Sequence, residues 1–451
     1  MAFLDRLFRL YPTERGLVLT LGFLLLSNSL ALNLSDVVAI SGFLSDVGPN
    51  GFLVVWSINM LLIVLTTGVQ SLVVDRFNRI RVMQMMCLFL MLAYITLPFM
   101  FAGNLLPDWF NYSTLYLLAE QQGLFFPIVF WVLANDMFNA AQARRLFPII
   151  SSWAFAGQIL GLSLAGSFPF LPNYINVTSR ELLFFNAVLF LLAYILLTRR
   201  LYKVKIRETQ YKRETIRETL TEGWGFVREV PSFRYLMFSM LAIYLALTIL
   251  DYHFLVESDR TPLLNEAGNF QTFYASFHLV LTLAAVAIQG LLTSRIITKM
   301  ALKNTFFILP SMLLASAVAV LAIPGLISAA LGLGVPYLTK DSIDESAQKS
   351  LQALVPEERR GRVSLFMDSY LYAFGTILGC LVTGVALIIG YQWPYINNSY
   401  FYLPLAVLSA ICAIVAVFKM RAAYETSLLN WRLKRRSRRA SATSVFELLD
   451  L

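Results

Sequence analysis

Apolar runs long enough to cross a lipid bilayer recur along the whole chain, and this feature restricts the fold more than any other. The core of a bilayer holds no water, so every backbone amide of a spanning segment must bond within that segment, and runs of about 20 apolar residues become helices. Only 14% of the residues are charged, compared with about 25% in soluble domains. Twelve such runs lie near residues 16–34, 51–74, 82–103, 112–134, 147–170, 181–199, 235–256, 271–293, 304–322, 325–346, 365–390 and 399–420. The sequence predicts an all-α membrane protein with twelve transmembrane helices.

The cationic side chains favour one orientation of these helices. They gather in alternate connections, including residues 76–81, 144–145, 203–228, 295–303, 359–362 and the tail 432–439. Cytoplasmic loops carry an excess of Lys and Arg, so both termini are predicted to be cytoplasmic, in the inner membrane of a cell. The opposite connections hold few cations, chiefly Arg180 and Arg260. The net charge of +9 lies beside apolar spans, which favours anionic lipid headgroups over nucleic acid as a partner.

The two halves of the chain repeat a glycine pattern. Gly157 and Gly161 recur as Gly375 and Gly379, and Gly166 recurs as Gly384. A repeat of six helices keeps the same membrane orientation, and glycines four residues apart let two helices approach closely. We therefore predict an N-terminal six-helix bundle over 1–199, a charged cytoplasmic linker over 200–232, a C-terminal six-helix bundle over 233–420 and a basic cytoplasmic tail over 421–451.

Polar side chains inside the predicted spans are the candidates for substrate contact, because an ionisable group in a bilayer is costly and usually functional. Lys340 is the best anchor for an anion, with an intrahelical ion pair to Asp344 as the alternative interpretation. A proton-coupling role for the histidines is as plausible as a structural one. The candidate substrate-binding residues are Glu120, Asp251, His253, His278, Gln289, Lys340 and Asp344.

A second group of polar residues lies at the predicted cytoplasmic ends of spans and suggests a gate. Asp136 follows Asn135 near the end of the fourth span, where pairing with Arg144 or Arg145 as a gate latch is at least as plausible as contact with a ligand. The repeat relates several of the cations between the halves. The candidate gating residues are Asn135, Asp136, Arg144, Arg145, Arg76, Arg295 and Arg362.

The usual catalytic and metal sites have no support in the sequence. The chain has two histidines, both in predicted spans, and its three cysteines lie far apart. It also lacks the G-x-x-x-x-G-K-[ST] loop that cradles phosphates in ATP-hydrolysing pumps. We expect no enzyme activity, no catalytic residues, no metal site and no cofactor.

Three segments resemble the ATP/ADP translocase branch of the major facilitator superfamily. They are residues 131–147 (WVLANDMFNAAQARRLF), Asp251-Tyr252-His253-Phe254 with the later Gln289 and Arg295, and the two runs 339–342 (TKDS) and 355–362 (VPEERRGR). The resemblance implies two six-helix halves and the exchange of nucleotides such as ATP and ADP. It also implies that Glu120, Asp251 and Lys340 face the substrate.

The resemblance has departures that bear on the substrate. Glu345-Ser-Ala-Gln-Lys349 stands where the family has D-P-T-K-E, and Leu255 stands where a basic residue is expected. Each phosphate charge in a cavity of low dielectric constant needs a cationic partner, so a less charged substrate is an alternative. We predict a monomeric secondary transporter, an antiporter, that moves an organic anion by alternating access between two halves, with a nucleotide of the ATP/ADP type as the candidate substrate. A membrane sensor or lipid-handling protein that keeps this fold but transports nothing is the other hypothesis.

Overall fold

The computed structural model describes residues 11–449 apart from 75–77, 104–105, 174–179, 202–215, 266–267, 353–354, 356 and 394. The described elements are all helical, which confirms the predicted all-α class. Among the described residues, eleven helices are long and apolar enough to cross a membrane. They form two compact units.

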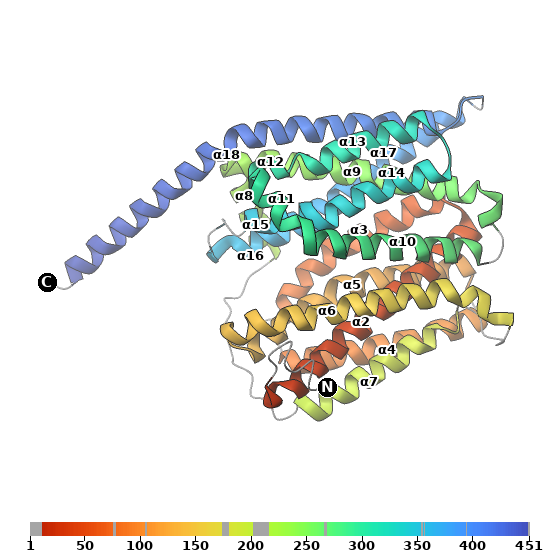
Figure 1. The fold of residues 1–451 in the computed structure, drawn as a ribbon, viewed down its shortest axis with the longest axis horizontal. Helices are drawn as coiled ribbons and strands as arrows, with labels where there is room; N and C mark the ends of the chain where they lie inside the picture. Colours follow the sequence, from red (N-terminus) through yellow and green to blue (C-terminus); the bar gives the residue numbers. More distant parts are fainter. Residues whose placement is uncertain are drawn as a thin grey trace. The chain divides into compact units, whose positions relative to one another are not determined.

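Unit 1 comprises residues 1–215 and 255–283. Its second segment runs from the end of α9 (Pro231–Asp259) into the start of α10 (Asn269–Ile288). The sequence assigned this segment to the C-terminal bundle. The predicted domain boundaries stay a prediction. The helix α2 has the most extensive contacts in this unit, against α5, α6 and α7 (Figure 1). The helices from the first segment are α2 (Pro12–Val47), α3 (Asn50–Val74), α4 (Arg79–Ala102), α5 (Asp108–Met137), α6 (Ala140–Ser167), η1 (Phe168–Asn173) and α7 (Leu183–Leu201).

Unit 2 comprises residues 216–254 and 284–451. Its last helix, α18, runs without a break from Ser399 to Leu449, as Figure 1 shows. The side chains of the predicted basic tail beyond Tyr424 lie outside the described part. The elements that reach into this unit are α8 (Ile216–Glu229), α9 (Pro231–Asp259), α10 (Asn269–Ile288), η3 (Gln289–Thr293), α11 (Ser294–Met300), α12 (Leu302–Thr305), α13 (Ile308–Ala322), α14 (Leu326–Thr339), η4 (Lys340–Asp344), α15 (Glu345–Gln352), α16 (Glu357–Leu365), η5 (Phe366–Tyr370), α17 (Leu371–Tyr391) and α18 (Ser399–Leu449).

The expected tenth span, 325–346, is not among the eleven candidate spans. The chain is helical here, through α14, η4 and α15. However, Lys340, Asp341 and Asp344 lie within the segment and lower its hydropathy, and η4 is a π-helix. A π-turn inside a helix often marks a functional site. The same charges that disqualify the segment as a simple apolar span therefore make it the first place to look for function.

The repeated glycines bring helices into close contact in both units. A Cβ atom at Gly157 would overlap the Leu26 carbonyl oxygen, and one at Gly161 would lie 2.6 Å from the Leu30 carbonyl oxygen, so α6 packs directly on the α2 backbone. In unit 2, a Cβ atom at Gly375 would lie 2.6 Å from the Tyr244 Cβ atom, so α17 packs equally closely on α9. Close approach at small residues is typical of membrane helices.

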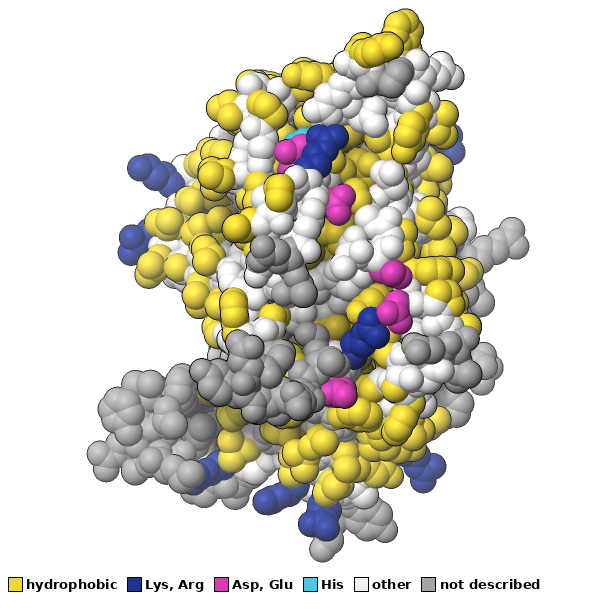
Figure 2. Space-filling model, turned by 90° about the vertical axis from the view of Figure 1, so that its right-hand side faces the viewer, with side chains coloured by type: hydrophobic (Ala, Val, Ile, Leu, Met, Phe, Trp, Pro, Cys, Tyr) yellow, Lys and Arg dark blue, Asp and Glu magenta, His cyan; other side chains and the backbone are white. Residues whose placement is uncertain are grey.

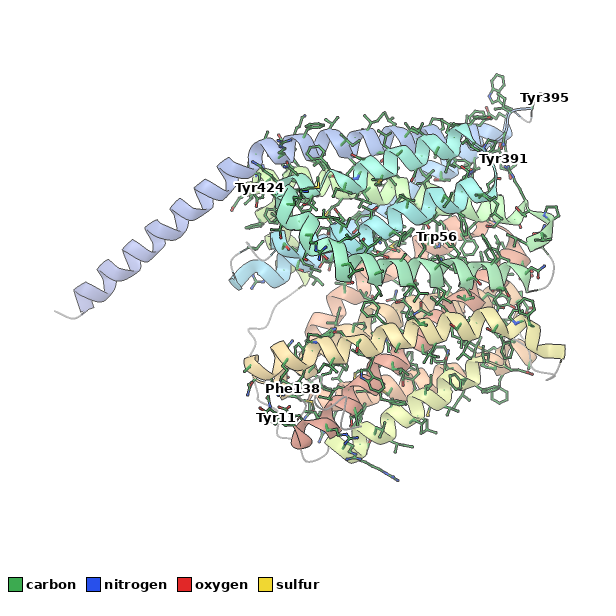
Figure 3. The ribbon with its side chains drawn as sticks, viewed as in Figure 1. Tyr11, Trp56, Phe138, Tyr391, Tyr395 and Tyr424 are labelled. Atoms are coloured by element: carbon green, nitrogen blue, oxygen red, sulfur yellow. The ribbon has the colours of Figure 1, made fainter. Side chains whose placement is uncertain are left out.

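Aromatic side chains lie at the ends of the helices. In unit 1, Tyr11 precedes α2 and Phe138 follows α5, and both lie at the same end of the unit (Figure 3). In unit 2, Tyr391 and Tyr395 lie at the opposite end from Tyr424 (Figure 3). Amphipathic rings favour the headgroup level of a bilayer, so these positions agree with helices that span it.

Candidate functional site

The ammonium group of Lys340 is enclosed by three tyrosine rings in unit 2. Its Nζ atom lies 5.1 Å from the ring centroid of Tyr337, 5.9 Å from that of Tyr244 and 6.0 Å from that of Tyr372. The rings come from α14, α9 and α17, and Tyr244 and Tyr372 also meet edge to face at 5.1 Å. A cation over aromatic faces is attracted by their negative potential, the more so where water is excluded. This arrangement holds a half-buried cation against the aromatic rings of the unit.

Asp251 is joined to the same group through Tyr337. The Tyr337 hydroxyl donates a hydrogen bond of 2.9 Å to the Asp251 carboxylate, so a single tyrosine links the carboxyl group on α9 with the cation in η4. Asp344 accepts a hydrogen bond of 2.6 Å from Gln348, one turn further along. The carboxylate of Asp344 is thus bonded along the helix to Gln348, while the Lys340 ammonium group lies against the tyrosine rings.

Two π-turns meet beside this group. The Thr293 hydroxyl at the end of η3 donates a hydrogen bond of 2.9 Å to the backbone carbonyl oxygen of Ser342 in η4. In a π-turn the backbone carbonyl groups do not all accept the regular α-helical hydrogen bonds. A side-chain donor such as the Thr293 hydroxyl therefore stabilises the turn. Gln289 begins η3 and is exposed, as is Arg295 in α11. Neither side chain forms a hydrogen bond or ion pair with Lys340 in the described part of the chain, and their predicted roles stay predictions.

Glu120 belongs to unit 1 and makes its contacts within that unit. Its carboxylate accepts a hydrogen bond of 3.1 Å from Asn59 on α3, and Gln121 donates one of 3.0 Å to the same asparagine. Asp36 on α2 is close enough to Glu120 for the two carboxyl groups to interact electrostatically. The sequence analysis missed Asp36 because the first span was placed at 16–34, whereas α2 continues to Val47. The apolar residues that follow Asp36 were the available signal.

Next to Glu120, a buried network of uncharged groups joins four helices of unit 1. Gln122 accepts a hydrogen bond of 2.6 Å from the Tyr94 hydroxyl and donates one of 3.1 Å to Asn28. Ser35 donates to Tyr94 at 3.1 Å and accepts from Asn186 at 2.9 Å. Buried polar groups that satisfy one another fix a single helix arrangement. This network is structural and carries no charge.

The suggested pairing of Asp136 with Arg145 is not formed among the described residues, and the side chain of Arg144, the other suggested partner, lies outside them. Asp136 forms an ion pair with Arg79 at the start of α4, and both side chains are less than one-tenth exposed. Because α4 begins close to the end of α5, Arg79 reaches Asp136 from the neighbouring helix, which sequence distance alone does not reveal. The Asn135 side chain bonds the Trp131 carbonyl oxygen of its own helix.

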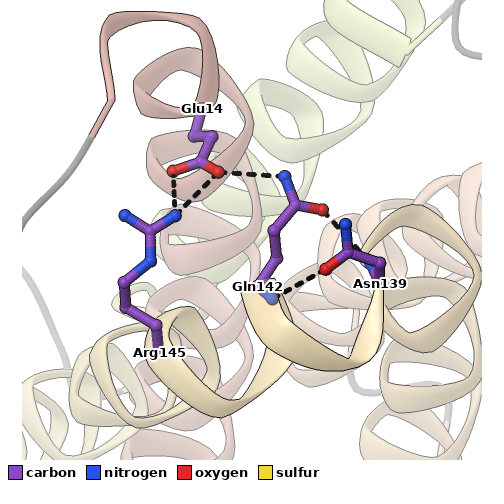
Figure 4. A network of polar contacts seen from close by, with 4 residues as sticks. All are labelled: Glu14, Asn139, Gln142 and Arg145. Carbon is purple, nitrogen blue, oxygen red and sulfur yellow. Dashed lines mark hydrogen bonds and ion pairs between the residues drawn. The ribbon is translucent and has the colours of Figure 1, made fainter.

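Arg145 instead pairs with Glu14 of α2. The two Arg145 hydrogen bonds to the Glu14 carboxylate measure 2.7 and 2.8 Å, and Gln142 donates a third to it at 2.9 Å (Figure 4). Gln142 also completes the capping box with Asn139 that starts α6. The cap therefore holds the Gln142 side chain in the position from which it bonds Glu14. Arg76 and the side chain of Arg144 lie outside the described residues.

In unit 2, a comparable polar cluster surrounds Asp368 of η5. Its carboxylate accepts hydrogen bonds from Lys349 at 2.5 Å, from Gln352 at 2.8 Å and from Ser364 at 2.9 Å. The cluster ties α15, α16 and η5 together. Arg362, the candidate gating residue on α16, is half-buried beside Val363 in the same stretch.

The two histidines lie in different units. The His253 Nδ1 atom is 2.9 Å from the Tyr402 hydroxyl, and the ring is buried in unit 2. The His278 ring lies tilted against the Tyr274 ring, with centroids 4.3 Å apart, in the part of α10 that belongs to unit 1. The structure therefore brings Asp251 and Lys340 together through Tyr337, and it places neither histidine in that group.

Comparisons with known proteins agree with this architecture. Residues 77–330 match the family model described as TLC ATP/ADP transporter. No curated protein matches the chain. A mutant of the nucleoside transporter NupG is similar in structure with a TM-score of 0.65 and 18% identity, over 90% of this chain and 100% of that one. A bacterial homologue of the iron transporter ferroportin has a TM-score of 0.60 and 17% identity, over 91% and 100% of the two chains.

A bacterial homologue of the lysosomal transporter Spinster gives a TM-score of 0.55 and 15% identity, over 94% of this chain and 98% of that one. At these identities the likeness shows the transporter fold alone. The family model, in contrast, covers more than half of the chain. The predicted family and the prediction of a secondary membrane transporter are both confirmed, and the chain belongs to the TLC ATP/ADP transporter family.

Proposed function

We propose that this protein exchanges nucleotides across a membrane, with the anionic part of the substrate attracted by Lys340. The observation that carries the proposal is a lysine held inside a helical unit by three tyrosine rings, in a chain of the TLC ATP/ADP transporter family. A lysine in the interior of a membrane protein is costly unless it serves a ligand or a partner. Tyrosine rings stabilise the cation without neutralising it, and this leaves its charge for an anion.

The surrounding carboxyl groups limit how much negative charge the substrate carries. The groups that interact electrostatically with Lys340 are those of Asp251, Asp341, Asp344 and Glu345. One cation beside four acids offers little net attraction for a polyphosphate, whose charges each need a partner. We therefore propose that nucleotides with fewer phosphates are preferred over ATP, and that protonation of these acids accompanies substrate binding.

The experiment is uptake into proteoliposomes that contain the purified protein. Labelled AMP, ADP and ATP outside are tested against each unlabelled nucleotide inside. Lys340→Ala and Lys340→Arg are compared with Lys299→Met, which removes an exposed lysine in α11. We expect exchange to be lost in Lys340→Ala, partly kept in Lys340→Arg and unchanged in Lys299→Met. Exchange that survives Lys340→Ala at the full rate removes Lys340 from the mechanism.

We also propose a topology and a location for the chain. The segment from α14 to α15 adds a twelfth crossing, its charges shielded inside unit 2, and both termini face the cytoplasm of an inner cell membrane. The alternate placement of the cationic connections supports this orientation. Single cysteines introduced before α2 and after α18 are expected to react with a membrane-impermeant maleimide only in inside-out vesicles. Labelling of one terminus from each side would contradict an even number of crossings.

A further inference from the structure

A cavity of about 520 Å³ lies within unit 1, at the end where α2 terminates. Small-molecule sites usually measure about 300–1,000 Å³, so this cavity has the size of a small-molecule site. It is distinct from the Lys340 group, whose residues all belong to unit 2. Its lining comes from α2, the start of α5, the turn before α7, the end of α9 and the start of α10.

One wall of the cavity presents a guanidinium group that the protein holds firmly in place. Arg180 donates hydrogen bonds to the Tyr112 hydroxyl at 3.0 Å and to the Asp108 carboxylate at 2.5 Å. It lies over the rings of Phe101 and Tyr112, at 4.8 and 5.4 Å from their centroids. Burial lowers the pKa of Arg180, but the interactions with Tyr112 and Asp108 raise it by more. The net shift of the pKa is upward, and the group stays charged. Its Nη1 atom has no bonding partner among the described residues.

The backbone on both sides of the cavity is shaped to keep this arrangement. A Cβ atom at Gly42 would overlap the Tyr112 ring, so only glycine lets that ring lie on α2 and carry its hydroxyl to Arg180. Gly268 has a φ of +85°, and a Cβ atom there would lie 2.5 Å from the Pro169 Cβ atom. Glycine adopts such a conformation without steric cost. The cavity is thus preformed.

The opposite wall carries polar groups of a different kind. Ser258 is fully buried, and its hydroxyl is without a hydrogen-bond partner in the described part of the chain, although it lines the cavity. A buried hydroxyl without a partner is destabilising, so a ligand that bonds it gains affinity. Asp259 supplies a carboxylate beside it. Tyr112 and Phe270 add aromatic surface that suits a planar ring.

The charges of the lining are balanced. Arg180 is paired with Asp108, and Asp259 adds a negative group, so the cavity has no excess of positive charge. In the face drawn in Figure 2, dark blue and magenta side chains lie next to one another among hydrophobic and uncharged ones. A cavity lining with balanced charges does not attract a polyphosphate. It suits a neutral solute that has hydrogen-bond acceptors at one end and donors at the other.

We propose that this cavity is a second solute site, which binds a nucleoside: acceptors on the base or sugar bond Arg180, and donors bond Ser258 and Asp259. The proposal rests on the proposed function for its ligand class and adds a site that is separate from Lys340. The full-length protein in lipid nanodiscs is titrated with labelled adenosine, AMP and ATP. The variants are Arg180→Gln, Asp259→Asn and Asn265→Trp, the last of which fills the cavity from an exposed position.

The control is Arg260→Gln, because Arg260 is an exposed cation next to the site that bonds Glu257 and does not line the cavity. We expect saturable adenosine binding, weakened about tenfold or more by Arg180→Gln and Asp259→Asn, abolished by Asn265→Trp and unchanged by Arg260→Gln. Absence of saturable adenosine binding, or full adenosine binding in Asn265→Trp, overturns the proposal.

The variant Lys340→Ala separates this inference from the proposed function. We expect it to lose nucleotide exchange in proteoliposomes and to keep adenosine binding in nanodiscs. Binding without any exchange in the wild-type protein would contradict the proposed function and leave the second site standing. Exchange without adenosine binding would contradict the second site and leave the proposed function standing.

Discussion

The interiors of the two units differ although their helices pack by the same device. Both units use glycines four residues apart to bring two helices into contact, α6 on α2 and α17 on α9. The buried network of unit 1 then consists of uncharged carboxamides and hydroxyls that bond one another. Unit 2 encloses a lysine among tyrosines and carboxyl groups and interrupts its helices with π-turns. The two units therefore share the glycine contacts between their helices, whereas the polar side chains inside them differ.

The atoms that the repeated glycines contact also differ between the two units. In unit 1 the glycines meet the carbonyl oxygens of Leu26 and Leu30, so backbone packs on backbone. In unit 2 Gly375 meets Tyr244, whose ring also faces Lys340. The packing device of unit 2 is therefore connected to the candidate site, and that of unit 1 is not.

The largest effect is expected from Gly157→Ala. The new methyl group overlaps a carbonyl oxygen that cannot turn away, so α6 must move off α2, at a cost of about 3 kcal/mol or more. Gly375→Ala meets a side chain as well as backbone and should cost less, while lowering transport because Tyr244 shifts. Gly225→Ala is the control, since a Cβ atom there is in open space. Thermal unfolding in detergent measures all three, and equal stability of Gly157→Ala and Gly225→Ala would break the comparison.

The second effect concerns the ion pairs of the two units. Asp136→Asn removes the negative charge that pairs with the buried Arg79 but keeps an amide oxygen that can accept its hydrogen bond, so a cost of about 2 kcal/mol is expected. Lys349→Met removes the partner of Asp368, but this lysine is about half exposed, so a loss of at most about 1 kcal/mol is expected. The midpoint of chemical unfolding compares the two variants. If Lys349→Met proves the more harmful, the cluster at Asp368 is more important to the fold than its exposure indicates.

A third pair of variants separates structure from transport. Tyr337→Phe keeps the ring over Lys340 and removes the hydrogen bond to Asp251, so we expect about a tenfold loss of exchange rate with little loss of stability. Gln122→Leu breaks the uncharged network of unit 1, which should lower stability and leave the KM for nucleotide unchanged. Tyr244→Phe serves as the control for a tyrosine hydroxyl beside the same lysine. Initial rates and unfolding midpoints are measured on the same preparations, and a Tyr337→Phe protein with normal exchange contradicts a role for that bond.

The smallest effect tests the third glycine of the repeat. A Cβ atom at Gly166 would lie 3.0 Å from that of Ala275, while one at Gly384 would be in open space. Gly384→Ala is expected to stabilise the protein by less than about 1 kcal/mol through helix propensity, and Gly166→Ala to be neutral or slightly destabilising. Opposite signs in the unfolding midpoints would support a difference between the units at these equivalent positions.

Much of the fold could be predicted from the sequence, because membrane spans are local features. Apolar runs, charged connections and the recurring glycines each lie within a few residues of one another. The candidate site was less predictable. Lys340 and Asp251 stood out as charges in apolar runs, but Tyr244, Tyr337 and Tyr372 looked like ordinary aromatic residues of a membrane helix. Asp136 was assigned the nearest arginines in sequence, whereas its partner Arg79 comes from a helix that precedes it by one span.

The sequence by itself determined that the chain is helical and bilayer-spanning, and which residues are too polar to lie in lipid without a reason. The bilayer imposes these properties on each segment separately, so a local pattern is enough to read them. Tertiary structure alone decided which charges meet: Asp251 and Lys340 at one tyrosine, Glu14 with Arg145, and Arg180 on the wall of a cavity. Those contacts depend on how helices far apart in the sequence pack against one another. The free energy of that packing is a sum over many weak contacts, so no single position in the sequence reveals it.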